Sequence, residues 1–213
     1  MTRSNNPANH IVLAFLGILI MSGLISSMIS VNLVHTTSAL TVGKQTATYR
    51  GFWRTCEIVG NGPAACHQIA ASASLNKLPT YLAFSRVCII ISFVAVTIAT
   101  FLSILGNPLM TKCCNVNRKM MTFLTAGTFL LSGILSLVCY SWYTNAAMKN
   151  YVTVLGPGKA PVSKWDLGWG MWVGFVSSIF TILGSGHALY TAISTQNEEG
   201  VKNYEAGREM GGY

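Results

Sequence analysis

GFWRTCEIVGNGPAACHQ, residues 51–68, places two cysteines, Cys56 and Cys66, on either side of a turn signal. The turn is Gly60-Asn61-Gly62-Pro63, in which glycine and asparagine tolerate left-handed backbone angles and proline fixes its own. Just upstream, the segment from Thr46 to Trp53 is rich in threonine, tyrosine and aromatic residues, which is typical of a β-strand. The sequence therefore predicts a hairpin that is closed by a disulfide between Cys56 and Cys66.

Four long apolar runs flank this polar stretch: residues 11–34, 81–105, 121–143 and 167–193. Each matches the roughly 20 apolar residues that a helix needs to cross the hydrocarbon core of a bilayer. Backbone polar groups in lipid must bond within their own segment, so all four runs are predicted to be helical. The sequence therefore predicts an all-α membrane protein, a left-handed bundle of four transmembrane helices, with a small extracellular antiparallel β-sheet.

The composition agrees with a membrane protein. Hydrophobic residues make up 51% of the 213 residues and charged residues only 9%, against about 25% in soluble domains. The formal charge of +8 is spread between the apolar runs and forms no basic stripe, which argues against nucleic-acid binding. The cysteines show no paired Cys-x-x-Cys or Cys/His spacing, so neither a metal site nor a cofactor is predicted.

The disulfide also orients the chain. Four spans place both termini on one side, but lysine and arginine are divided almost equally between the two sets of loops, so the positive-inside rule does not decide which side. Disulfides persist on the oxidising side of a membrane. Residues 35–80 and 144–166 are therefore predicted to be extracellular, and residues 1–10, 106–120 and 194–213 cytosolic.

Several features of the spans leave alternatives open. Residues 11–34 can also be read as a signal peptide, but the run is longer than a typical h-region, which favours an uncleaved anchor. Arg86 is costly in lipid, so we expect it to snorkel or pair at the outer end of its helix, or only to anchor the interface. His187 is expected to pack between helices or lie at the interface. Small residues allow close helix packing, and the third and fourth spans carry Gly127, Gly133, Gly168, Gly170, Gly174, Gly184 and Gly186.

The cysteine segment carries a family resemblance. Gly51-Phe52-Trp53-x-x-Cys56, followed after nine residues by Cys66, resembles the Gly-Leu-Trp-x-x-Cys…Cys signature of claudins and their relatives. Phe52 replaces the leucine, and Trp53 matches the tryptophan, whose indole is expected to be buried. Further similarities are Arg86 at the start of the second span, Lys112-Cys113 after it, Tyr151 in the second outer loop, and Lys164-Trp165-Asp166-Leu167-Gly168 before the fourth span. The resemblance covers nearly the whole chain.

Two positions depart from the family pattern. A family tryptophan near the end of the first span would fall at about Asn32, where this chain has none. Claudins commonly end in Tyr-Val, whose aliphatic residue binds PDZ domains, whereas this chain ends in Tyr213. The polar tail from Thr195 to Tyr213 is predicted to be disordered, and its binding to PDZ scaffolds is predicted to be weak or absent.

The resemblance implies a tight-junction structural protein in the plasma membrane at cell–cell contacts. Such a protein, embedded in membrane lipid, would polymerise in cis and in trans with itself or with other claudins, and its outer sheet would line or block a paracellular path. Tyr151, Val152 and Leu155 would supply adhesion, with ordinary packing under the loop as the alternative. The alternative function is that of an auxiliary subunit of an ion channel or receptor. The outer loops pair no nucleophile with a base, so no enzyme is predicted.

The predicted outer loops are basic. Residues 35–80 carry four basic side chains against one acidic, a formal +3, and residues 144–166 carry three against one, a formal +2. Basic rings favour anions in a narrow aqueous path. Glu57 and His67 follow the two cysteines, where acidic residues set the preference of cation-conducting claudins, and the nearby cations are Arg54 and Lys44. The sequence predicts a barrier or a weakly anion-preferring path. Alternatively, these charges only solvate the loops or meet acidic lipids and glycans.

Two further cysteines follow the second span. Cys113 and Cys114 lie beside Lys112 in the predicted cytosolic loop. Cysteines at the cytosolic membrane surface are typical sites of S-palmitoylation. We therefore predict acylation of both thiols, with two unmodified loop cysteines as the alternative.

Overall fold

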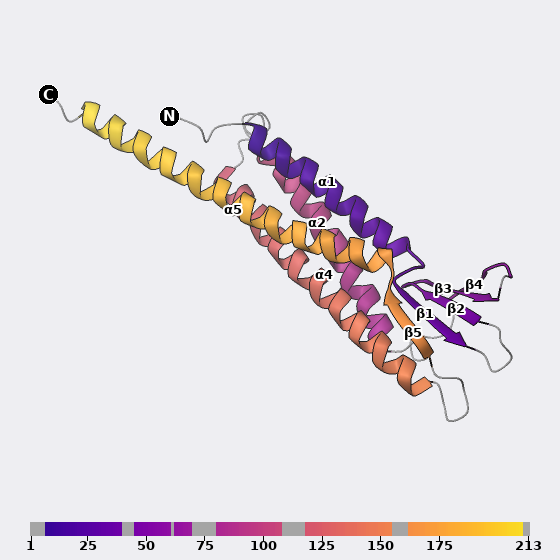
Figure 1. Ribbon diagram of the computed structural model, residues 1–213. Coiled ribbons are helices and arrows are strands. Elements are labelled where there is room, and N and C mark those ends of the chain that lie inside the picture. Colours follow the sequence, from indigo (N-terminus) through magenta and orange to yellow (C-terminus); the bar gives the residue numbers. More distant parts are fainter. Residues whose placement is uncertain are drawn as a thin grey trace.

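The computed structural model describes residues 7–39, 45–60, 62–69, 80–107, 118–154 and 162–210. Within these residues, four helices are long and apolar enough to cross a membrane. They are α1 (Pro7–Ile29), α2 (Thr80–Leu105), α4 (Arg118–Val154) and α5 (Trp169–Met210). Figure 1 shows the helices packed lengthwise, with a sheet at one end and both the start of α1 and the end of α5 toward the other. The predicted bundle of four membrane helices is confirmed.

The sheet has five antiparallel strands in the order β4-β3-β2-β1-β5. They are β1 (Val34–Ala39), β2 (Gln45–Arg50), β3 (Arg54–Val59), β4 (Ala65–Gln68) and β5 (Val162–Leu167). β5, orange in Figure 1, precedes α5 and pairs with β1, so segments far apart in the sequence share one sheet. The predicted small antiparallel sheet is confirmed, and it includes a strand from the second loop that the sequence pattern did not indicate.

The helices differ from the predicted spans at the sheet end. The sequence predicts a first span over residues 11–34, but α1 ends at Ile29 and β1 begins at Val34. Leu33 and Val34 are buried. The first strand therefore starts in the core, and this is why the apolar run extends beyond the end of α1. At the same end α4 continues to Val154. Helix therefore replaces much of the loop predicted over residues 144–166.

The C-terminal tail also differs from the prediction. Disorder is predicted from Thr195, but α5 continues as a helix of 42 residues to Met210. The tail contains four glutamates together with Lys202, Ala206 and Arg208, and these residue types have high intrinsic helix propensity. A helix already formed by the membrane span needs no new nucleus, so propagation into such a sequence is favourable. The prediction of a disordered tail is wrong for residues 195–210.

Small residues let α4 and α5 approach each other closely. A Cβ atom on Gly174 would overlap the ring of Tyr140, and one on Gly133 would lie 2.7 Å from the Cγ1 atom of Ile182. A Cβ atom on Gly127 or Gly186 would meet nothing within 4 Å. These last two glycines are therefore not close packing positions, although the sequence pattern grouped them with the others.

Candidate functional site

The sheet is joined to the helix bundle by Phe52. This side chain is 0% exposed. Its ring lies 4.9 Å from the ring of Tyr143 and 6.0 Å from that of Tyr140, measured between centroids at tilted angles. The Tyr143 hydroxyl donates a hydrogen bond to the carbonyl of Gly51 at 3.4 Å. The loop between β2 and β3 is thus inserted between aromatic side chains of α4.

Arg86 of α2 holds the same loop from the other side. Its side chain is only 8% exposed. Its Nε atom donates to the carbonyl of Phe52 at 2.9 Å, and its Nη2 atom donates to the carbonyl of Ile69 at 3.3 Å. Both carbonyls receive donors from a charged group, which makes the bonds stronger than neutral ones. Of the interpretations left open by the sequence, the structure supports pairing at the sheet end of the helix.

Trp53 is not the buried residue of the signature. Its side chain is 36% exposed, and the Arg86 guanidinium lies 4.6 Å from the centre of its ring. The expectation of a buried indole is wrong because consecutive side chains point in different directions, and Phe52 takes the position that faces the core. Trp53 instead covers Arg86 through a cation–π contact.

The hairpin has the predicted disulfide. Cys56 and Cys66 are directly opposite each other in the register of β3 and β4, and they are bonded. Gly60 follows β3 with a φ of 60°, a left-handed angle that glycine adopts without a Cβ clash. Beyond β4, the amide of Ile69 donates to the carbonyl of Trp53 at 2.9 Å. The hairpin is therefore closed at both ends.

Glu57 and His67 lie on one face of the sheet, and Arg54 lies on the other. His67 is opposite Thr55 in the register. Since alternate residues of a strand share a face, Thr55, Glu57 and His67 point to the same side, and Glu57 and His67 are diagonal neighbours. Arg54 points to the side of Cys56. All three charged or titratable side chains are exposed, and Lys44 lies outside the described residues.

Arg50 is a basic side chain on the same side of the sheet as Glu57. It is opposite Thr55 in the register of β2 and β3, so it shares the face of Glu57 and His67. It is half-buried, and its Nη1 atom lies 3.4 Å from the Tyr81 hydroxyl oxygen at the start of α2, to which it donates. The sequence did not single out Arg50 because its face depends on the register. We call Arg50, Glu57 and His67 the Glu57 face.

The other predicted sites fall at the edges of the described chain. Tyr151 and Val152 lie in the last turn of α4, where the sequence predicts an adhesive loop. Leu155 and both candidate acylation sites, Cys113 and Cys114, lie outside the described residues. Asn32, which occupies the approximate position of the family tryptophan, lies at the junction, where its carbonyl accepts the amide of Gly170 at 3.1 Å.

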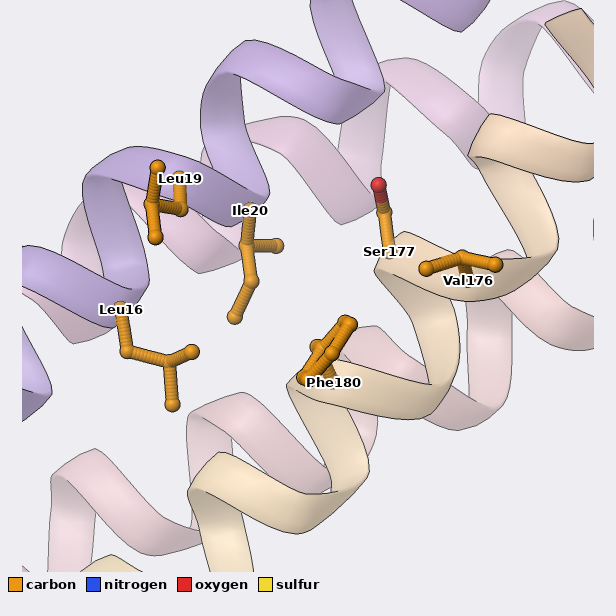
Figure 2. A pocket seen from close by; sticks show the side chains of 6 residues that line it. All are labelled: Leu16, Leu19, Ile20, Val176, Ser177 and Phe180. Carbon is orange, nitrogen blue, oxygen red and sulfur yellow. The ribbon is translucent and has the colours of Figure 1, made fainter.

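An apolar groove lies between α1 and α5 (Figure 2). Its volume is about 230 Å³, and its lining is Leu16, Leu19, Ile20, Val176, Ser177 and Phe180. These residues come from the middle of both spans, so the groove lies at membrane depth and offers a single hydroxyl as a polar group. Elsewhere on α5, His187 is half-buried, and the described residues bring together no three acidic, histidine or cysteine side chains that could hold a metal ion.

Comparison with known proteins finds a family model that covers most of the chain. Residues 10–188 match the model of the PMP-22/EMP/MP20/Claudin family. Claudin-14 of Mus musculus is 28% identical over 188 residues, which cover 85% of this chain and 74% of the relative. Claudin-4 of Homo sapiens is 29% identical over 143 residues, or 65% of this chain and 64% of the relative. Claudin-3 of Rattus norvegicus is 26% identical over 138 residues, or 64% of this chain and 60% of the relative.

Proposed function

The chain belongs to the PMP-22/EMP/MP20/Claudin family, and from this premise we propose that it is a tight-junction structural protein of the plasma membrane. In this proposal it associates side by side with itself or with other claudins, meets the neighbouring cell head to head, and has both termini in the cytosol. The observation that supports the proposal is the sheet, which combines both loops of one end and is fixed to the bundle by Phe52 and Arg86. A rigid sheet of this kind is suited to shape an aqueous path between cells.

Localisation tests the structural role. Expressed in cells that lack tight junctions, the protein is expected to gather at cell–cell contacts and form strands. The variant Arg86→Lys keeps the charge but loses the planar fork of donors. It tests whether strand formation requires a sheet that is fixed to the bundle. If the wild-type protein stays diffuse until a larger channel or receptor is supplied, the proposal is refuted in favour of the auxiliary-subunit alternative.

We further propose that the Glu57 face lines the path and gives a barrier or a weak preference for anions. Glu57 and His67 are exposed on this face, while Arg50 adds a cation beside them. The wider field of the loops is positive, with a formal +3 over residues 35–80. In an aqueous path such a field favours anions, and the effect decreases with salt because exposed charges are screened beyond about 8–10 Å near physiological ionic strength.

Dilution potentials across an epithelial layer expressing the protein test this preference. We expect the wild-type protein to favour neither ion strongly or to favour chloride, and Glu57→Gln to move the ratio further toward chloride. Arg54→Gln is the matched control, because it removes one charge from the opposite face of the same strand. A clear sodium preference in the wild type would contradict the proposal. If the two substitutions changed the ion preference by equal amounts, whatever the direction, the assignment of the Glu57 face to the path would be contradicted.

A further inference from the structure

Three large aromatic side chains are exposed near the sheet end of the bundle. Trp169 and Trp172 begin α5, and Trp142 lies on α4, and all three are more than half exposed. Trp169 and Trp172 are three residues apart, so they share one side of their helix. Trp142 lies elsewhere on the bundle, where its ring is 5.8 Å from that of Phe84 on α2. Exposed tryptophans are thus found on more than one side of the bundle.

A chain of contacts places these tryptophans at one level. A Cβ atom on Gly170 would overlap the Ser30 hydroxyl, and one on Gly51 would overlap the Ser30 carbonyl. The Gly51 carbonyl accepts the hydrogen bond from Tyr143. The α5 tryptophans flank Gly170, and Trp142 directly precedes Tyr143. All three indoles therefore lie within the same layer, which is also the layer where the sheet meets the bundle.

The opposite end of α5 supplies a second level. Tyr190 is strongly exposed and lies 18 residues after Trp172, which at 1.5 Å per residue is about 27 Å along the helix. Between them the exposed α5 side chains are apolar: Val176, Ile179, Phe180, Leu183 and Leu189. The hydrocarbon core of a bilayer is about 30 Å thick, and tryptophan and tyrosine are enriched at both of its boundaries.

We propose that Trp142, Trp169 and Trp172 anchor the protein in the glycerol and carbonyl layer of the leaflet nearest the sheet. An indole has an apolar ring and a single N–H donor, which fits the layer where ester carbonyls meet acyl chains. Only Gly168 separates β5 from α5, so the depth of Trp169 sets the height of the sheet. The sheet consequently stands directly on the lipid headgroups. At Asn32, in the connection between α1 and β1, the chain has a polar residue.

The depth of each indole can be measured by fluorescence quenching. Proteins with a single tryptophan, the other four of the five replaced by phenylalanine, are reconstituted in phosphatidylcholine vesicles with bromines near either the ester end or the methyl end of the acyl chains. Trp172 is expected to be quenched more strongly by the ester-end lipid. Phe180→Trp, about 12 Å further along the helix, is the deep control, and Val59→Trp at the hairpin end is the control outside the bilayer.

Stronger quenching of Trp172 by the methyl-end lipid, or none by either lipid, would overturn the proposal. If the single-tryptophan proteins do not fold, the same lipids are applied to Trp172→Phe in the otherwise unchanged chain. That substitution is expected to remove part of the emission quenched by the ester-end lipid. An unchanged quenched emission would also refute the anchoring role. Junction localisation is not part of either readout, so failure here is distinct from failure of the proposed function.

Discussion

Replacing Phe52 by alanine is the most direct test of how the sheet is fixed to the bundle. Phe52 is completely buried and contacts the rings of Tyr140 and Tyr143. Truncating a buried phenylalanine typically costs about 3–5 kcal/mol, because contacts are lost and a cavity remains. For a chain of this size, 1 kcal/mol shifts the melting temperature by about 2–4 °C. We therefore expect Phe52→Ala to lower the melting temperature by about 6–20 °C.

Two buried thiols provide the assay for this prediction. Cys88 and Cys139 lie in the core between α2 and α4, so a maleimide dye reacts with them only as the purified protein unfolds in detergent. Phe52→Leu restores the residue of the family signature, and it is expected to lower the melting temperature less than Phe52→Ala does. Val59→Ala, at an exposed position of the hairpin, is the matched control. If Phe52→Ala melts within a degree or so of Val59→Ala, the junction does not depend on the buried ring.

The other predictions concern the same junction and the cysteines. Arg86→Lys should destabilise the protein by about 1–3 kcal/mol, because one buried carbonyl loses its donor; an unchanged melting temperature would contradict this. Cys56 and Cys66 should resist a membrane-impermeant thiol reagent on intact, non-reduced cells, and strong labelling of either would contradict an extracellular disulfide. Changing Cys113 and Cys114 together to serine should abolish the signal in an acyl-exchange assay, and a retained signal would place acylation elsewhere.

The sequence predicted the spans well because the bilayer imposes a simple rule. A helix that crosses lipid needs a long apolar run with few charges, and each of the four runs became a helix. The rule fails where the solvent changes. Val34 is as apolar as the residues of α1, yet it begins β1, because the first residue of a strand that starts in the core is as apolar as a residue of a membrane helix. The prediction of a disordered tail failed for a different reason. A polar sequence excludes a membrane span, but it does not exclude a helix.

The junction could be predicted only in part. The signature motif pointed to Trp53 and Arg86, and the structure brings these two side chains together. It did not show that Phe52 is the buried residue, because the turn between β2 and β3 decides which of two adjacent aromatic side chains faces the core. The pairing of β5 with β1 also requires contacts between residues more than 120 positions apart, for which a single sequence contains no local signal.

The disulfide connects the stability of the hairpin with the charge of the Glu57 face. A shift of one residue in strand register moves every side chain of a strand to the other face of the sheet. β4 has only four residues, all of them exposed, so apolar burial contributes little to fixing its register. Because Cys56 and Cys66 are directly opposite and bonded, the only register compatible with the bond is the one that places His67 beside Glu57. The same bond that restricts the unfolded loop therefore also determines which side chains β4 presents on each face, and mutations of the cysteines are expected to change the proposed ion preference as well as the stability of the fold.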